Sequence, residues 1–291
     1  MTTHLQAQPL IVYGHNYCPQ SRALAAALKQ YDIRHDWRDV LTGQPRYRVE
    51  LAVGDLEKSE SLDAALEGVE AAFLISGDDP RLAELHGNFA ARAKRAGVKH
   101  LVRMSILVSR PDSPLTLGQW HWSADQLIMQ SGVPYTILKP AYFMQNLLGL
   151  APMVKMKGIL PGVMGDGKVG LIDVRDIAAV AAAVLTTDGH AGKTYPLTGP
   201  EALSLGDAAA KLSAALGKEI KYVKLSPEEA KAAMIAMGMP ELSAAAWVQL
   251  GGMIAQGAAS MLTPFVQEIT GTAPRSFDQF AKEYAGVFKS E

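Results

Sequence analysis

Apolar strand-like runs that alternate with amphipathic helical patterns are the feature of this sequence that most restricts its fold. Residues 71–75, 100–104 and 134–139 are short, mainly apolar runs. The helix predicted between the first two, residues 79–97, repeats apolar side chains every three or four positions. Strands separated by helices of this length predict an α/β fold with a parallel, doubly wound sheet. The first run is apolar throughout, as is typical of a parallel strand buried on both faces.

The chain opens with a predicted strand, turn, helix and second strand across residues 10–39, followed by a third strand at residues 49–53. This spacing fits a right-handed βαβ unit. In a Rossmann fold, glycines in the first turn let the backbone approach the pyrophosphate of a dinucleotide. Here residues 14–21 read GHNYCPQS, and only Gly14 supplies a glycine. We therefore expect weakened dinucleotide binding. Arg22 is either a compensating phosphate contact or a solvated arginine.

The alternation of predicted strands and helices changes after Pro140. A passage rich in Gly, Pro and Met is followed by helices predicted at residues 175–186 and 205–216 and by a capping box at Ser226. We predict a Rossmann-like nucleotide-binding domain at residues 1–150. A smaller, mostly helical lobe is expected at residues 151–291, with residues 165–200 returning to the main sheet.

Composition narrows the classes of function. The 28 basic and 29 acidic residues nearly cancel, which indicates no nucleic-acid surface. A single cysteine excludes a disulfide framework and a Cys-rich zinc site, so we predict no metal and a cytoplasmic setting. We see no signal peptide. Residues 242–267 carry no charge, but glycines, polar residues and a proline interrupt them, so we predict a docked helix and no membrane span.

Several segments from about residue 49 to the C-terminus resemble the NmrA-like branch of the atypical short-chain dehydrogenases, which includes NAD(P)H:quinone oxidoreductases and triphenylmethane reductase. They stand in the family's order and read VELAVGDLEKSESLDAALEGVEAAFLISG, ARAKRAGVKHLVRMS, SGVPYTILKPAYFMQNLL, IDVRDIAAVAAAVL, HAGKTYPLTGPEALS and PRSFDQFAKEYA. The resemblance implies a Rossmann-like fold that binds NAD(P)H.

It also implies cofactor contacts at the carboxyl ends of the strands, where α/β folds bind ligands. Asp55 and Leu56 would bracket the adenine, and Ser76 and Gly77 would lie near the cofactor ribose. The alternatives are an Asp-capped turn and an ordinary strand-ending glycine.

Arg38 ends the second predicted strand, where an arginine would accommodate the 2′-phosphate of NADP. The family also places an arginine there. We therefore predict that NADP(H) is preferred over NAD(H). The alternative is a solvated arginine in a crowded basic region, which also holds Arg34, Arg46 and Arg48.

His121 and Asp125 stand where the wider superfamily has its catalytic Tyr-Lys pair. They are four residues apart on a predicted helix and can touch. A histidine with a carboxylate neighbour can be held in one tautomer and can donate a proton near neutral pH. Ser105 stands where the superfamily's catalytic serine lies. A structural ion pair and an ordinary strand-ending serine are the alternatives.

The resemblance places one further segment beside the nicotinamide. Pro140 and Phe143 match the family's cofactor contacts there, Tyr142 is a candidate catalytic residue and Asn146 a candidate polar contact. A flat acceptor that receives a hydride directly needs chiefly stacking and orientation. The alternative is ordinary packing.

The opening segment IVYGHNYCPQSRALAAALKQYDIRHDWRDV, followed by TGQPRYR, is similar instead to glutaredoxin-like and mycoredoxin-like proteins. Their active-site motif would here take the one-thiol form at residues 18–21. We interpret the chain as a hybrid whose first βαβ unit is glutaredoxin-like. Cys18 at a helix N-terminus would be a reactive redox thiol; the alternative is an inherited cysteine without a role.

Three functions follow. The leading hypothesis is an NAD(P)H-binding oxidoreductase that passes a hydride to a small conjugated acceptor such as a quinone. The second is a non-catalytic NmrA-like redox sensor that binds dinucleotide and signals through a protein partner, and the third is thiol chemistry at Cys18. The sequence leaves the acceptor open, and it leaves open whether the chain forms a homodimer.

Overall fold

The computed structural model describes residues 11–13 and 54–289. Contacts divide the chain into two compact units. Unit 1 comprises Met1–Ser105, Trp120–Lys139 and Ala178–Tyr195, and unit 2 comprises Ile106–Gln119, Pro140–Ile177 and Pro196–Glu291. The predicted boundary at residue 150 stays a prediction.

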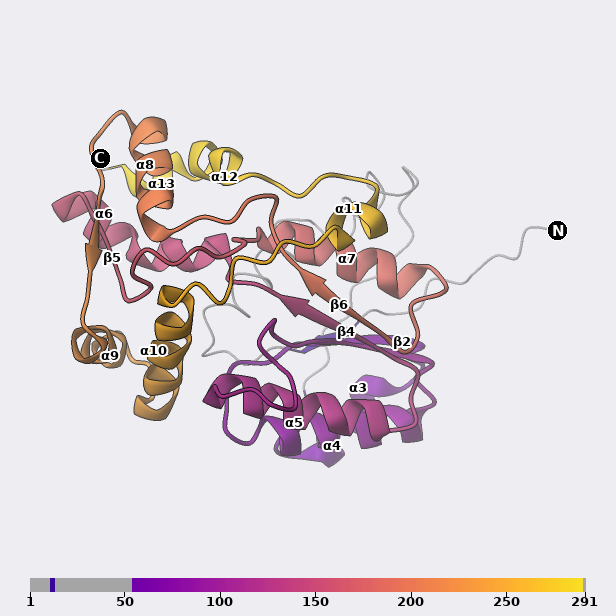
Figure 1. Cartoon of the computed structure of the whole chain (residues 1–291). Coiled ribbons are helices and arrows are strands. Elements are labelled where there is room, and N and C mark those ends of the chain that lie inside the picture. Colours follow the sequence, from indigo (N-terminus) through magenta and orange to yellow (C-terminus); the bar gives the residue numbers. More distant parts are fainter. Residues whose placement is uncertain (1–10, 14–53, 290–291) are drawn as a thin grey trace. The chain divides into compact units, whose positions relative to one another are not determined.

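One five-stranded sheet lies mainly in unit 1 (Figure 1). Its order is β1-β2-β3-β4-β6, and the strands are β1 (Ile11–Tyr13), β2 (Ala71–Leu74), β3 (His100–Met104), β4 (Tyr135–Pro140) and β6 (Lys193–Leu197). The pairs β1–β2, β2–β3 and β3–β4 are parallel. This confirms the predicted parallel α/β sheet, and β6 lies within the predicted return segment.

The pairing of β1 with β2 indicates where a fold of this kind binds ligands. Val12 pairs with Phe73 of β2, so the first strand of the chain lies beside the strand predicted fourth from the sequence. In doubly wound folds this is the place where the strand order reverses, and ligands bind outside the carboxyl ends of the strands there. The strands predicted at residues 32–37 and 49–53, and the glutaredoxin-like helix between residues 19 and 30, lie outside the described residues.

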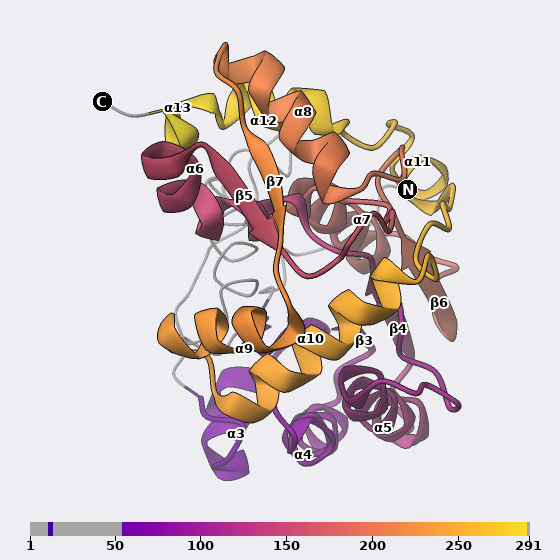
Figure 2. The same ribbon diagram turned by 60° about the vertical axis from the view of Figure 1, so that its left-hand side comes forward.

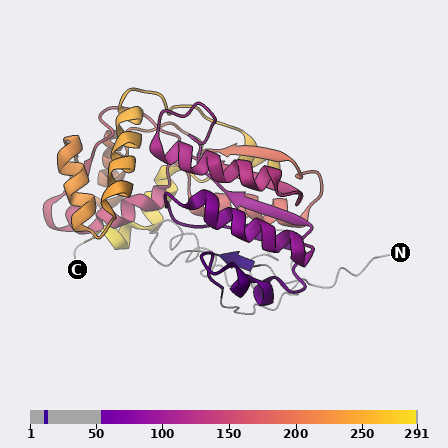
Figure 3. The same ribbon diagram turned by 90° about the horizontal axis from the view of Figure 1, so that it is seen from below.

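Helices cover both faces of the sheet. Figure 1 shows α4 (Leu82–Ala96) and α5 (Thr116–Gln130) on one face and α7 (Val174–Thr186) on the other, and Figure 3 shows α4 and α5 side by side. Helix α4 forms as the sequence predicts, with its apolar side chains buried and with Gly97 at φ 77° ending it. The core between these layers contains Leu74, Phe89 and Leu101, each 0% exposed.

The short helix α3 (Leu62–Leu66) directly follows Ser61, a residue type that often caps helices. Ser61 makes no side-chain cap hydrogen bond, because it has helical backbone angles as the last residue of the 3-10 turn η1 (Ser59–Ser61). Its hydroxyl donates to the Lys58 carbonyl at 2.7 Å and accepts from the Asp55 N–H at 2.8 Å. The hydroxyl therefore closes the loop before α3.

Unit 2 pairs a small parallel sheet with short helices (Figure 2). The strands are β5 (Ile159–Gly162) and β7 (Lys221–Lys224), and the helices are η2 (Met144–Leu150), α6 (Ala151–Lys157), α8 (Leu205–Leu216), α9 (Pro227–Ala236), α10 (Glu241–Ala255), α11 (Phe265–Thr270), α12 (Phe277–Glu283) and α13 (Ala285–Phe288). The predicted capping box at Ser226 is confirmed, since its hydroxyl accepts from the Glu229 N–H at 3.1 Å.

The uncharged stretch at residues 242–267 contains the 15-residue helix α10 except its first residue, Glu241, and also the beginning of α11. Among the described residues, none of the helices combines the length and the apolar character that crossing a bilayer requires.

Candidate functional site

The carboxyl ends of β2 and β3 carry polar residues at one edge of the sheet in unit 1. Ser76, Gly77 and Asp78 follow β2, and Ser105 directly follows β3. Because β2 and β3 pair in parallel, both ends lie at the same edge. The Ser105 N–H donates to the Leu138 carbonyl of β4 at 2.7 Å, which fixes the start of the loop after β3.

Arg103 is the centre of a buried network that connects these residues. Its side chain extends from β3 and is 0% exposed. Nε donates to Nδ1 of His86 on α4 at 2.8 Å, and Nη1 donates to Oδ1 of Asp125 on α5. Nη2 lies 3.3 Å from Nδ1 of His121, also on α5. One planar guanidinium therefore binds side chains of two helices.

The tautomers of both histidines follow from this geometry. A guanidinium only donates hydrogen bonds, so Nδ1 of each ring accepts and Nε2 carries the proton. His86 Nε2–H then donates to Oγ of Ser76 at 2.7 Å, and the Ser76 hydroxyl donates to the Gly77 carbonyl at 3.2 Å. His121 Nε2–H donates to Oδ1 of Asp78 at 3.0 Å. Both imidazoles thereby connect Arg103 to the residues that follow β2.

Asp125 is the buried counter-charge of this network. Its Oδ2 accepts from Oγ of Ser105 at 3.0 Å and lies 3.2 Å from Nζ of Lys139. The Lys139 ammonium also lies 5.3 Å from the centroid of the Trp122 ring, a cation–π contact. Buried charges are stable only when they are paired and hydrogen-bonded. Asp125 meets this requirement through donors from two strands.

Burial determines the protonation of the two histidines. It lowers the pKa of His121, and the nearby Arg103 charge lowers it further, although the hydrogen bond to Asp78 acts in the opposite direction. Burial, then Arg103 and then His121 hold the pKa of His86 well below its usual value. Both rings are therefore neutral near pH 7, in agreement with the tautomers above.

The side chains of four predicted site residues meet in this network, namely Ser76, Ser105, His121 and Asp125, and a fifth, Gly77, joins it through its carbonyl. The carboxylate that is hydrogen-bonded to the His121 ring is Asp78, while the charge of Asp125 acts to raise the pKa of the ring. The lowered pKa of His121 disfavours the predicted proton donation near neutral pH, because the ring holds no extra proton there.

Sequence reasoning missed His86, Arg103, Lys139 and Asp78. Two of them left a signal in the sequence. His86 lies on the apolar face of α4 between Leu82 and Phe89, and Arg103 interrupts the buried apolar run at residues 101–104 of β3. Since such positions rarely hold a polar side chain unless it is paired, both indicate a buried polar network.

The predicted acceptor segment lies in unit 2. The ring of Tyr142 packs edge-to-face on Trp247 of α10, with centroids 5.9 Å apart. Burial raises the pKa of the Tyr142 phenol to about 12, although its hydrogen bond with Asn146 lowers it slightly. The phenol is therefore a weaker acid than usual. Phe143 is buried and its backbone pairs with Ile172, and Pro140 ends β4.

The remaining predicted contacts divide into two groups. Oδ1 of Asp55 accepts a hydrogen bond from the Glu57 N–H at 2.9 Å, as expected from the alternative interpretation of Asp55 as the cap of a turn. The Leu56 carbonyl accepts a hydrogen bond from the Asn88 side chain at 3.1 Å. Their predicted adenine contact stays a prediction. Four other predicted residues lie outside the described part of the chain, namely Gly14, Cys18, Arg22 and Arg38.

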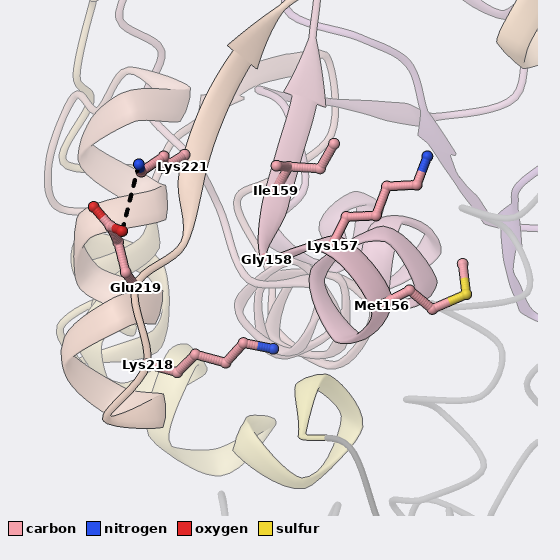
Figure 4. A pocket seen from close by; sticks show the side chains of 7 residues that line it. All are labelled: Met156, Lys157, Gly158, Ile159, Lys218, Glu219 and Lys221. Carbon is pink, nitrogen blue, oxygen red and sulfur yellow. Dashed lines mark ion pairs between the residues drawn. The ribbon is translucent and has the colours of Figure 1, made fainter.

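Unit 2 also contains a surface cavity of about 360 Å³, shown in Figure 4. It is lined by Met156, Lys157, Gly158, Ile159, Lys218, Glu219 and Lys221. Glu219 pairs with Lys221 at 3.5 Å, and Lys218 donates to the Lys155 carbonyl at 3.2 Å. None of the predicted site residues that the structure describes is among these lining residues.

The sheet order and the polar edge define an α/β protein of the dinucleotide-binding class. The model of the NmrA-like family matches residues 25–254, and the chain belongs to this family.

Individual relatives agree with this assignment. The chain is 41% identical over 240 residues to NAD(P)H azoreductase of Xenophilus azovorans, which covers 82% of this chain and 84% of the relative. It is 36% identical to quinone oxidoreductase 2 of Escherichia coli (strain K12), over 64% of this chain and 65% of the relative. Its structure is similar to that of an Escherichia coli NADPH-dependent quinone oxidoreductase complexed with NADPH, with TM-score 0.76, 26% identity and coverage of 94% and 99% of the two chains.

Proposed function

We propose that this chain is an NAD(P)H-dependent reductase that passes a hydride to a small conjugated acceptor such as a quinone or an azo compound. The observation that carries the proposal is the 41% identity to the azoreductase over 82% of the chain. Azo compounds and quinones share a flat, electron-accepting π-system. A common reductase scaffold is therefore compatible with both.

The hydrogen-bonding groups at the edge of the sheet in unit 1 fit a nicotinamide dinucleotide. Ser76 and Asp78 place oxygen atoms at the carboxyl end of β2, and both are held there by neutral histidines. Ribose hydroxyls can donate to such oxygens, and Gly77 has no side chain to keep a ligand away. The dinucleotide would supply the hydride when bound. The contacts proposed at Asp55, Leu56, Pro140 and Phe143 belong to the same hypothesis.

The side chains of the site orient the cofactor and the acceptor and do not supply a proton to the acceptor. The single N–H of the neutral His121 ring is engaged by Asp78, and Asp125 is bound by Arg103, Ser105 and Lys139. Direct hydride transfer to a flat acceptor depends chiefly on stacking and alignment. Tyr142 accordingly serves the acceptor by ring contact, because its phenol is a poor acid at neutral pH.

A first experiment measures binding and turnover separately. Fluorescence titration with NADPH and NADH should show saturable binding, and NADPH absorbance should fall when a quinone or an azo dye is added. Failure of both dinucleotides to bind at millimolar concentration would overturn the proposal. Binding without turnover of any acceptor would favour the non-catalytic sensor instead.

The thiol hypothesis has a test of its own. Cys18→Ser should reduce the acceptor at the wild-type rate if hydride transfer needs no thiol. A rate that falls severalfold in this variant, with NADPH binding unchanged, would assign Cys18 a part in the reaction.

A further inference from the structure

We infer that Arg103 is a positioning residue that fixes the polar edge of unit 1 for the dinucleotide. It acts on Ser76 through His86, on Asp78 through His121 and on Ser105 through Asp125. The inference rests on the proposed dinucleotide site and assigns a role to side chains that sequence reasoning did not select.

Each connection uses a different nitrogen of one rigid group. The first runs 2.8 Å from Nε to His86 and 2.7 Å from His86 to Ser76. The second runs 3.3 Å from Nη2 to His121 and 3.0 Å from His121 to Asp78. The third runs from Nη1 to Asp125, whose other oxygen accepts from Ser105 at 3.0 Å. Because the guanidinium is planar, these three connections cannot rotate independently.

Stability alone gives little reason for an arginine at this position. A buried ion pair is often no more stabilising than apolar side chains of similar volume, because both charges lose their hydration. An apolar residue in β3 would fill the space but would leave the rings of His86 and His121 without a donor at Nδ1. The arginine therefore contributes mainly the orientation of its partners.

The connection through His86 offers the sharpest test, since it can be broken or copied. His86→Leu removes both hydrogen bonds of the ring. His86→Gln offers an amide oxygen to accept from Arg103 and an amide nitrogen to donate to Ser76. We expect the Kd for NADPH to rise about tenfold in His86→Leu, which corresponds to the loss of roughly one hydrogen bond. In His86→Gln the Kd should stay within about threefold of wild type. The acceptor KM should not change in either variant.

Ser76→Ala tests the same connection at its partly buried end without altering a buried charge. It should weaken NADPH binding about as much as His86→Leu, and the double variant should be no weaker than either single variant, because both remove one pathway. Arg92→Lys is the matched control. Arg92 lies on α4 in the same unit, pairs with Asp63 and Glu60, and should leave the Kd unchanged.

Circular dichroism and thermal unfolding establish that each variant is folded. Additive losses in the double variant, wild-type affinity in a folded His86→Leu, or equal losses in His86→Leu and His86→Gln would each overturn the positioning role while the proposed function stands. Absence of NADPH binding by the wild-type protein would instead overturn both proposals.

Discussion

At the residue scale, the site depends on histidines that burial keeps neutral. His86 is 1% exposed and His121 is 5% exposed, and each ring accepts a hydrogen bond from Arg103. Protonation of either ring would place a second positive charge against the guanidinium. The network is therefore matched to neutral pH, where Arg103 and Lys139 pair with Asp125 and the neutral His121 ring binds Asp78.

The free energy of unfolding should fall as the pH falls below about 6.5, because the unfolded chain then binds protons that the folded network rejects. The folded pKa of His86 lies below its unfolded value, so its contribution is complete above the unfolded pKa and is lost toward the folded one. Denaturant titrations at several pH values give the slope of the free energy of unfolding against pH. His86→Gln should reduce this slope by up to about 1.4 kcal/mol per pH unit between the unfolded and the folded pKa of His86. An unchanged slope would contradict a neutral buried His86.

Tyr142 permits a separate test of its role. Tyr142→Phe keeps the ring on Trp247 and removes only a phenol whose pKa is about 12, so kcat should stay within about threefold of wild type. Tyr142→Ala removes the ring and should raise the acceptor KM about tenfold, as expected for a lost aromatic contact. Steady-state kinetics with a quinone measure both values. A tenfold lower kcat in Tyr142→Phe would instead indicate an acid role.

At the element scale, local patterns determined where helices begin and end, but close approaches between segments depend on glycines that no periodicity identifies. A methyl group added to Gly199 would lie 1.8 Å from the Leu171 carbonyl oxygen. The capping box at Ser226 and the end of α4 at Gly97 followed the sequence because each is local, whereas the contact of Gly199 with Leu171 joins segments far apart in the chain.

Gly199→Ala should therefore destabilise the fold by about 1–3 kcal/mol or more, through overpacking against the backbone. Urea unfolding measures the change. Gly149→Ala is the control, because a methyl group there meets nothing within 4 Å. Equal stability of the two variants would show that the segment around Leu171 yields easily.

The turn predicted at residues 14–21 belongs to the same scale, although these residues lie outside the described part of the chain. Replacing Tyr17, Cys18 and Gln20 by glycine should tighten NADPH binding, because the backbone could then approach the pyrophosphate. Fluorescence titration of the folded triple variant measures this. Equal affinity before and after would show that side chains do not limit binding at this turn.

At the scale of the whole molecule, the NmrA-like match extends over parts of both units, and it was visible in the sequence as several motifs in order. The parallel sheet was predictable because β2, β3 and β4 are mainly apolar runs separated by helices. The partners of Arg103 were not predictable, because His86, His121 and Asp125 lie 17, 18 and 22 residues away on two different helices.

Cofactor choice also belongs to this scale, because we predict that it depends on Arg38 at the end of the second predicted strand. Arg38→Ala should weaken NADPH binding about tenfold or more and leave NADH binding nearly unchanged, since only NADPH carries the 2′-phosphate. Parallel titrations with both dinucleotides measure the ratio. Equal weakening of both would remove the assignment of Arg38 to the phosphate.

The sequence by itself determined the order of strands and helices, the inward faces of helices such as α4 and the membership of a reductase-rich family, because hydrophobic periodicity and local motifs are properties of the chain. Only the tertiary structure decided that Ser76, Asp78 and Ser105 share one buried arginine. Periodicity reports which side chains face the interior, whereas their hydrogen-bond partners depend on the rotation and register of elements that meet only when the sheet is assembled.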